Sequence, residues 1–239
     1  MITYKKLNKV KAISFDLDDT LYNNMPYITA AEKSLSAYLS AHYPLVANLQ
    51  SAHWFEIKSA IVKSNPNIAN DVSELRRQSL AKAFAQNGMH ASEINEAVEN
   101  SFSHFYSQRS NFVVPNEVKE VLEQLSKRVP ITAITNGNVD CQAIGIAPYF
   151  TYILQANSEF AMKPHRSMFD HTARALNLNA ANILHVGDHV DKDVKGAINA
   201  GYQAAWLAVD RRMDLKREKL SVLPHIQLDA LHELLQLVS

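Results

Sequence analysis

Asp16 and Asp18 are the first residues of this chain whose types and spacing suggest chemistry. They end a short apolar run, and an extended backbone points side chains two residues apart in the same direction. Their like charges would repel unless a cation lies between them or the two carboxyls hold different protonation states. A single Asp-x-Asp pair also fits a solvated turn or a helix cap. Residues elsewhere in the sequence must therefore distinguish a reactive site from these structural roles.

Polar residues also follow three later apolar runs, at 131–134, 152–154 and 183–186. Ligands in open α/β sheets bind beyond the carboxyl ends of the strands, so a sheet would gather these residues beside the two aspartates. The residues concerned are Thr135, Asn136, Gly137, Lys163, Asp188 and Asp193. They supply carboxylates, an ammonium, a hydroxyl and a glycine that permits close backbone approach, which suits Mg²⁺ and a phosphate group.

The apolar spacing predicts the elements that must position these residues. A buried strand is expected at 12–17, and the spacing after Leu21 is then helical to about Gln108, on faces that predict four helices. Further strands are expected at 131–134, 152–154, 183–186 and 203–207, alternating with helices at 116–127, 167–176 and 191–200. Strands separated by helices predict parallel crossovers, so the expected fold class is α/β, a doubly wound parallel sheet with a helical insertion.

Local signals set the boundaries inside the helical stretch. Pro66 interrupts it between the second and third helices, and Asp71 with Glu74 resembles a capping box at the start of the third. Asn87 and Gly88 end that helix. Helix packing explains these apolar faces without a cofactor.

The composition favours a small-molecule partner. The 239 residues suffice for one large α/β domain or for a core with a smaller domain. Lys plus Arg and Asp plus Glu number 24 each, so no net charge favours nucleic acid or an anionic membrane. The run 211–219 is mixed in sign, which fits a solvated loop better than a nucleic-acid patch.

The single cysteine and the N-terminal sequence indicate a cytoplasmic location. Cys141 cannot form an intrachain disulfide, and a buried structural thiol is expected there. No apolar stretch precedes the first strand, so no signal peptide is expected. The uncharged stretch between Asp140 and Glu159 is interrupted by Gly145 and Pro148, which argues against a membrane helix.

The four polar groups resemble the motifs of the haloacid dehalogenase superfamily. The matching residues are Asp16-x-Asp18-x-Thr20, Thr135-Asn136-Gly137, Lys163-Pro164, and Gly187-Asp188 with Asp193. The resemblance covers the whole chain and implies a Rossmann-like core at 1–22 and 111–239 with an α-helical cap domain at 23–110. The longer strings at 15–22, 134–138 and 185–188 are similar to bacterial phosphatases that act on 5-amino-6-(5-phosphoribitylamino)uracil and FMN in riboflavin metabolism.

The resemblance implies different tasks for the two aspartates. Asp16 would attack phosphorus and form an aspartyl phosphate, while Asp18 would protonate the leaving alkoxide and later accept a proton from water. Mg²⁺ would be held by the carboxylates of Asp16 and Asp188 and by the backbone carbonyl of Asp18. The Asp18 side chain is thereby left for proton transfer.

The remaining motif residues would serve the phosphoryl group. Thr135 and the Asn136 amide would bind its oxygens, and Lys163 would neutralise its charge. Asp193 would orient Lys163 or a metal-bound water. Thr20 and Gly137 are expected to support the site without taking part in the chemistry. Thr20 would order the turn after the first motif.

The resemblance implies a phosphatase with a small phosphate ester as partner. Alternatives of two kinds stay open, one within the same superfamily and one outside it. Asp18 argues against dehalogenases, phosphonatases and transport ATPases, which lack an aspartate there, but phosphomutases keep it. The same superfamily also includes sugar and nucleotide phosphatases. A receiver-like signalling module is a different class, which predicts persistent phosphorylation without a small-molecule substrate. In either case we expect a monomer or a weak homodimer.

Several residues near the motifs have simple structural interpretations. His185 lies within an apolar strand and is expected to be a core histidine with satisfied hydrogen bonds. His165 and His189 are expected to be exposed loop residues, and Asp191 a helix cap.

Overall fold

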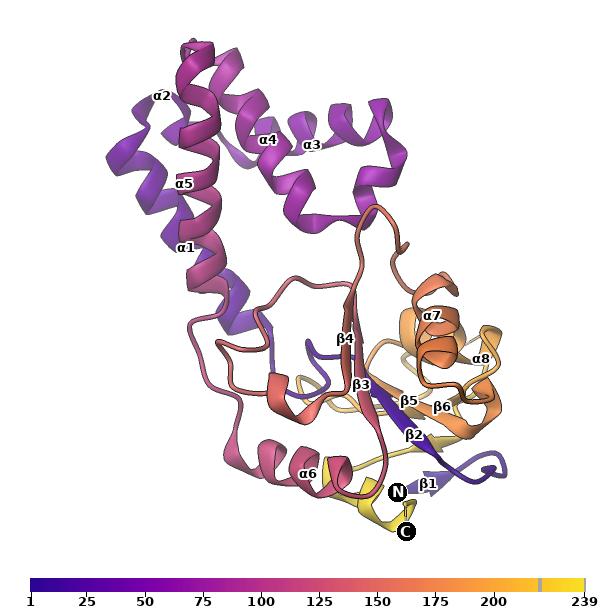
Figure 1. The fold of residues 1–239 in the computed structure, drawn as a ribbon. Coiled ribbons are helices and arrows are strands. Elements are labelled where there is room, and N and C mark those ends of the chain that lie inside the picture. Colours follow the sequence, from indigo (N-terminus) through magenta and orange to yellow (C-terminus); the bar gives the residue numbers. More distant parts are fainter. Residues whose placement is uncertain (219–220, 239) are drawn as a thin grey trace.

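A seven-stranded sheet forms the centre of the molecule, for which a computed structural model describes residues 1–218 and 221–238 (Figure 1). The strand order is β1-β7-β6-β5-β2-β3-β4, and every neighbouring pair is parallel except β1 with β7. The strands are β1 (Ile2–Thr3), β2 (Ala12–Phe15), β3 (Ile131–Thr135), β4 (Tyr152–Gln155), β5 (Ile183–Gly187), β6 (Gln203–Trp206) and β7 (Ile226–Gln227). The α/β class and the doubly wound sheet predicted from the sequence are confirmed.

β2 lies between β3 and β5 and is buried along its whole length. Apolar side chains cover both of its faces, as expected for a parallel sheet between two layers of helices. The cluster on one face packs around α6 (Asn116–Ser126), and the cluster on the other around α7 (Ser167–Ala175). The end of β2 is therefore a rigid place for a functional side chain.

The helix predicted at 191–200 is wrong in type. A π-helical turn at Val190–Lys195 leads into the short helix α8 (Gly196–Asn199). Single π turns are frequent at functional sites, because the widened turn changes where a side chain points. Here the widened turn carries Asp193, which is buried against β5. The edge strands β1 and β7 and the 3₁₀ turn Leu231–Gln236 were not predicted.

A bundle of helices stands above the carboxyl edge of the sheet (Figure 1). Its helices are α1 (Met25–His42), α2 (Pro44–Ala47), α3 (Ser51–Ser64), α4 (Val72–Gln86) and α5 (Ala91–Arg109), with a 3₁₀ turn at Pro66–Asn70. Four of them match the predicted helices, and α2 is an additional short one. The side chain of Asp71 accepts a hydrogen bond from the backbone N–H of Glu74, as predicted for the start of α4. The bundle has its own hydrophobic cluster, which includes Leu35, Leu80, Phe84 and Phe105.

Two linkers join the helical bundle to the sheet, one after Leu21 and the other after Arg109. Aromatic rings pack across this junction: Tyr27, in the first turn of α1, stacks on Phe112 of the second linker with centroids 3.8 Å apart, and Tyr22 of the first linker meets Phe112 edge-on at 4.8 Å. The bundle also touches the sheet loops directly. The Asn70 side chain accepts from the Met162 N–H at 2.9 Å, and the Asn138 amide donates to the Ser73 hydroxyl at 3.0 Å.

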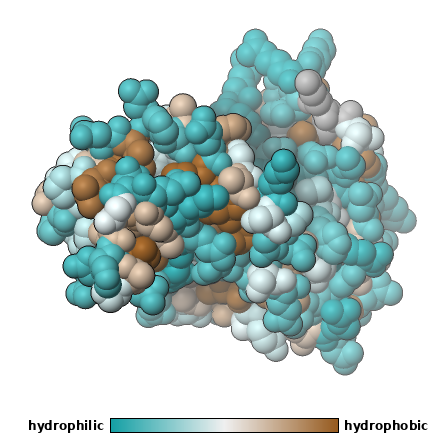
Figure 2. All heavy atoms as spheres, turned by 90° about the horizontal axis from the view of Figure 1, so that it is seen from above, coloured by the Kyte–Doolittle hydropathy of each residue, from teal (hydrophilic) through white to brown (hydrophobic). Residues whose placement is uncertain are grey.

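The outer surface is mainly hydrophilic when viewed from above the bundle (Figure 2). Hydrophobic residues appear there in several areas that hydrophilic residues separate. Leu45 and Phe55 are exposed apolar side chains of the bundle. Among the described residues, no helix combines the length and the apolar character that crossing a bilayer requires.

Candidate active site

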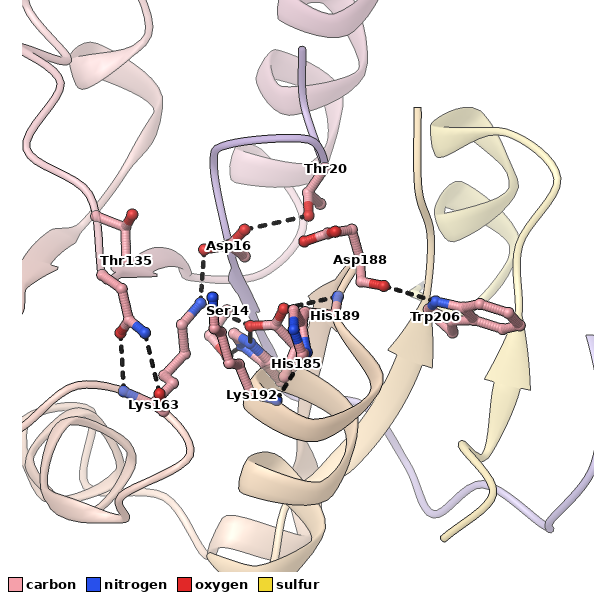
Figure 3. A network of polar contacts seen from close by, with 12 residues as sticks. Ser14, Asp16, Thr20, Thr135, Lys163, His185, Asp188, His189, Lys192 and Trp206 are labelled. Atoms are coloured by element: carbon pink, nitrogen blue, oxygen red, sulfur yellow. Dashed lines mark hydrogen bonds and ion pairs between the residues drawn. The ribbon is translucent and has the colours of Figure 1, made fainter. Parts of the chain in front are cut away.

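Asp16 lies at the carboxyl end of β2, with its side chain enclosed by the core. Its backbone N–H donates to the carbonyl of Val186 in β5 at 2.8 Å, which fixes the residue against the neighbouring strand. The Lys163 ammonium lies 2.6 Å from Asp16 Oδ1, and the Thr20 hydroxyl donates to Oδ2 at 3.4 Å. Figure 3 shows Lys163 and Asp188 on opposite sides of Asp16. Residues from three separate sequence motifs thus meet at one carboxylate.

A buried chain of polar contacts continues from Lys163 into the core. The same ammonium lies 2.6 Å from Asp193 Oδ1, which also contacts His185 Nε2 at 3.1 Å. His185 Nδ1 lies 2.8 Å from the Ser14 hydroxyl, and Asp193 Oδ2 accepts the His189 N–H at 3.0 Å. An ionised Asp193 can only accept, so His185 must carry its proton on Nε2 and accept from Ser14 on Nδ1.

The electrostatics of this chain favour one fixed charge state. Burial raises the pKa of Asp193, but Lys163 and His185 outweigh it and hold that pKa well below its usual range. For Lys163, burial alone would lower the pKa, but the carboxylates of Asp16 and Asp193 outweigh burial and raise that pKa. The pKa of His185 is lowered by burial, so the imidazole is neutral. Asp193 and Lys163 therefore form a permanent ion pair beside Asp16.

Gly187 is required by the position of Asp193. A Cβ atom at residue 187 would lie 2.3 Å from the Asp193 carboxyl carbon, closer than atoms can approach. Any side chain at this position would displace the carboxylate that holds Lys163. The glycine of the fourth motif is explained by this close approach and not by a turn.

Asp188, which follows β5, is the third carboxylate of the site. The carboxylate oxygens of Asp16, Asp188 and Asp193 lie within 4.8 Å of one another. Burial, followed by the charge of Asp193, raises the pKa of Asp188 to about 6. Asp193 Oδ1 is shared by Lys163 and His185 and its Oδ2 accepts the His189 N–H, whereas Asp16 Oδ2 has only the long 3.4 Å contact with Thr20, so Asp16 and Asp188 are the carboxylates better placed for a cation. A hard divalent cation prefers such oxygen ligands.

Arg211 also reaches Asp188, although the sequence placed it in a solvated loop. Its guanidinium contacts Asp188 Oδ2 at 2.9 Å and donates to the backbone carbonyl at 3.0 Å. The Trp206 indole donates to the same carbonyl at 2.7 Å. The backbone of Asp188 is therefore held firmly. Lys219, the last residue of the 211–219 run, lies outside the described residues.

Asp18 has surroundings unlike those of Asp16. Its Oδ1 accepts two hydrogen bonds of 2.7 Å, one from the Tyr22 hydroxyl and one from the Arg109 guanidinium. Its Oδ2 faces Gly137, where a Cβ atom would lie 2.6 Å from this oxygen. One oxygen is thus anchored, and the other points toward the loop after β3.

Thr135 and Asn136 lie in that loop in different ways. The Thr135 hydroxyl accepts from the Gly137 N–H at 3.0 Å and keeps its own proton for a ligand. Both ends of the Asn136 side chain bind the backbone of Lys163: its amide donates to the carbonyl at 3.0 Å, and its oxygen accepts the N–H at 2.8 Å. These two bonds fix the side chain against the Lys163 loop, so the backbone N–H of Asn136 is the better donor for a phosphoryl oxygen.

Some of these contacts were not predicted from the sequence. Arg109 had no signal in the pattern, and Arg211 had only a local charge pattern. His185 is a satisfied core histidine as predicted, but it belongs to the chain that holds Lys163. The predictions for His189 and Asp191 were wrong, because half-buried His189 caps the π-helical turn. Asp191 instead pairs with a lysine one turn later.

Comparison with known proteins agrees with this arrangement. Residues 10–201 match the sequence profile of haloacid dehalogenase-like hydrolases. The chain belongs to this family. The phosphatase YigB of Escherichia coli, named for 5-amino-6-(5-phospho-D-ribitylamino)uracil, is 32% identical over 98% of this chain and 99% of its own. N-acylneuraminate-9-phosphatase of Mus musculus is 25% identical over 95% of this chain and 93% of its own.

Among solved structures, one named as a 2-haloacid dehalogenase from Pseudomonas syringae is similar throughout. It superposes with a TM-score of 0.88 at 32% identity and covers 95% of this chain and 97% of its own. The putative hydrolase YfnB of Bacillus subtilis shares the fold at a TM-score of 0.65 and 17% identity, over 96% of this chain and 98% of its own. The family and its phosphatase members identify this haloacid dehalogenase-like protein as a phosphomonoester hydrolase.

Proposed function

We propose that the protein hydrolyses a small phosphomonoester with Mg²⁺ and through an aspartyl phosphate on Asp16. The observation that carries this proposal is the pairing of two dissimilar carboxylates. Asp16 is buried 2.6 Å from Lys163, while Asp18 keeps one oxygen free beside Gly137. A phosphatase of this kind needs a nucleophile held in place and a second carboxyl for proton transfer.

In the first step, the Asp16 carboxylate attacks phosphorus as the bond to the leaving oxygen breaks. Asp18 gives its proton to that oxygen, and the alcohol departs. In the second step Asp18 takes a proton from the attacking water, and the acyl phosphate is hydrolysed to inorganic phosphate and free Asp16. The Thr135 hydroxyl and Lys163 bind the phosphoryl oxygens throughout, which lowers the cost of their charge.

The donor set fits Mg²⁺. Burial raises the pKa values of both Asp16 and Asp188. The positive charges of Lys163 and Arg211 therefore do not fully offset the burial of these two carboxylates. A divalent cation would favour their ionised forms. The residues that would hold it are Asp16, Asp188 and the backbone carbonyl of Asp18. When bound, Mg²⁺ would neutralise phosphoryl charge and orient the ester for in-line attack.

The proposed substrate is 5-amino-6-(5-phospho-D-ribitylamino)uracil, with FMN second. The support is the similarity to YigB along nearly the full length of both chains. The bundle reaches the loops of the site through Asn70 and Ser73, and this contact supports assigning those two residues to the side of the leaving group. The helical cap at 23–110, the cytoplasmic location and the monomeric or weakly dimeric state stay predictions.

The other functions have less support from the site. A dehalogenase needs no acid at residue 18. Two hydrogen-bond donors hold Asp18 in a defined orientation, which favours a function that uses this carboxyl group. A receiver-like module needs a phosphoryl acceptor but no second carboxyl for the leaving group. A phosphomutase, like a sugar or nucleotide phosphatase, would keep the whole site and differ only in substrate or in access of water.

A phosphate-release panel tests the proposal. The purified chain would be incubated with Mg²⁺ and either the ribitylamino-uracil phosphate, FMN, sugar phosphates or nucleotides, and each reaction would be repeated with excess chelator. We expect chelator-sensitive release, fastest with the ribitylamino-uracil phosphate. Release that needs no divalent metal would contradict the mechanism, whereas equal rates across the panel would remove only the substrate.

A further inference from the structure

Both linkers to the helical bundle place a side chain on the same oxygen. Tyr22 belongs to the first linker and Arg109 ends α5 at the second, and each donates to Asp18 Oδ1 at 2.7 Å. Residues 22 and 109 are far apart in sequence, and each lies next to the point where the chain passes between sheet and bundle. The anchored oxygen of Asp18 is therefore fixed by both connections at once.

Arg109 is an unusual residue to bury. Its side chain is 2% exposed, and its Nη1 amino group has no hydrogen-bond partner among the described residues. Burying a guanidinium with an unpartnered amino group is unfavourable for folding. A methionine or leucine would fill the same space without that cost, so the contribution of Arg109 to stability does not account for it.

Arg109 fixes the orientation of the Asp18 carboxyl group. With Oδ1 held by two donors, the carboxyl group cannot rotate freely, and Oδ2 stays at the Gly137 side of the site. Thr135 lies on that same side, since its hydroxyl is 3.5 Å from the Cβ position at residue 137. Proton transfer requires a carboxyl oxygen in hydrogen-bond reach of the leaving oxygen, so this orientation matters for Asp18 more than for any other carboxyl of the site.

We propose that Arg109 is a positioning residue that holds Asp18 Oδ1 so that Oδ2 faces the leaving oxygen of the substrate. The inference rests on the proposed acid and base role of Asp18. Arg109 touches no reacting atom itself and acts through Asp18. Tyr22 supports the same orientation from the other linker.

Leaving-group dependence separates this role from a merely structural one. Protonation of the leaving oxygen matters little for 4-nitrophenolate, which is a stable anion, and more for the more basic phenolate. The measurement is kcat/KM for 4-nitrophenyl phosphate and phenyl phosphate, two substrates of nearly equal size. Because kcat/KM includes no step after the leaving group has departed, it excludes the later step in which Asp18 would act as a base, and the comparison of the two esters isolates the acid role.

We expect Arg109→Met to lower kcat/KM for phenyl phosphate by about 30-fold and for 4-nitrophenyl phosphate by less than about threefold. This is less than the roughly 10²–10⁴-fold that a general acid contributes, because Asp18 stays in place and Tyr22 still holds it. Arg109→Lys should recover most of the loss, and Tyr22→Phe should show the same pattern with a smaller size. Arg76→Met is the matched control. Like Arg109, Arg76 pairs with a carboxylate, here that of a glutamate, and it lies over a phenylalanine ring in the bundle. It should change neither value by more than about twofold.

Equal losses for both substrates in Arg109→Met, or no loss, would overturn the inference. If Arg109→Met does not fold, Arg109→Lys and Tyr22→Phe decide by the same comparison of substrates. Asp18→Asn is measured in parallel. If Asp18→Asn shows no leaving-group dependence, or if the unmodified chain hydrolyses neither ester, the proposed function has failed first and Arg109 with it.

Discussion

Asp16 and Asp18 are two residues apart, yet different parts of the molecule hold them. The partners of Asp16 belong to the sheet and its loops, and the contact with Lys163 is almost fully buried. The partners of Asp18 come from the two linkers, and its side chain is 22% exposed. The proposed nucleophile thus depends on the rigid core, whereas the proposed acid depends on how the bundle joins that core. Changes around Asp16 should affect every substrate, and changes around Asp18 should depend on the leaving group.

Asp16→Asn gives the largest effect in this comparison. An amide at this position is a poor nucleophile, so we expect phosphate release to fall by about 10⁴-fold or more with every substrate. The measurement is steady-state phosphate release, together with trapping of a phosphorylated protein, which the variant should not form. A variant that keeps more than a hundredth of the activity would contradict the assignment of Asp16.

Lys163→Met removes the only cation that contacts both Asp16 and Asp193 among the described residues. We expect kcat to fall by about 10²–10³-fold, because the phosphoryl charge loses its partner. The free energy of unfolding should fall by about 3–5 kcal/mol, since buried carboxylates are left unpaired.

Urea denaturation measures the change in stability caused by Lys163→Met. Lys127→Met is the matched control, because Lys127 is 68% exposed and pairs with Glu123. That control should change the free energy of unfolding by less than about 0.5 kcal/mol. Equal stability of the two variants would show that the buried ion pair contributes little.

Metal affinity should depend on pH through Asp188. Its pKa is about 6, so the carboxylate is ionised above that pH and protonated below it. We expect the Kd for Mg²⁺, measured by calorimetry, to rise by about tenfold for each pH unit below 6 because a proton competes with the cation at Asp188, and the raised pKa of Asp16 adds to this rise.

The same pKa gives a prediction for stability without metal. A raised pKa means that ionisation of Asp188 costs stability as the pH rises through about 6, and Asp16 adds in the same direction. At pH 8 in chelator, Asp188→Asn should therefore be at least as stable as the unmodified chain in thermal unfolding. A clear loss of stability would mean that the ion pair with Arg211 outweighs the burial.

His185→Phe should have the smallest effect on catalysis. The change removes the hydrogen bonds to Asp193 and Ser14 but leaves the contact between Asp193 and Lys163. We expect a loss of about 1–3 kcal/mol in the free energy of unfolding and less than about tenfold in kcat. His104→Phe is the control, since His104 contacts Ser34 in the bundle and should leave kcat unchanged. A loss near that of Lys163→Met would mean that His185 acts in catalysis directly.

The sequence predicted the sheet and the motif residues because both depend on local pattern. A run such as 131–134 is long enough to identify a buried strand, and the polar residues directly follow it. The strands β1 and β7 have two residues each, too few to show a period. The π turn at 190–195 has no recognised sequence signal, so an ordinary helix was the natural prediction.

The contacts of the two arginines could not be predicted for a different reason. Arg109 lies 91 residues from Asp18, and Arg211 lies 23 residues from Asp188. Neither spacing belongs to a helix, a strand or a turn, so only the folded chain shows which carboxylate each arginine meets. Periodicity identifies elements, whereas pairings between distant side chains depend on the angles at which those elements pack.

The stacked rings of Tyr27 and Phe112 have a consequence for protein engineering. Because Tyr27 at the start of α1 stacks on Phe112 of the second linker, the helical bundle enters and leaves the sheet at one narrow point. A bundle from another phosphatase could in principle be transplanted through this point without changing the strands. Such a chimera would need an arginine in register with Arg109, because without it Asp18 of the core would lose the contact proposed to turn its second oxygen toward the substrate.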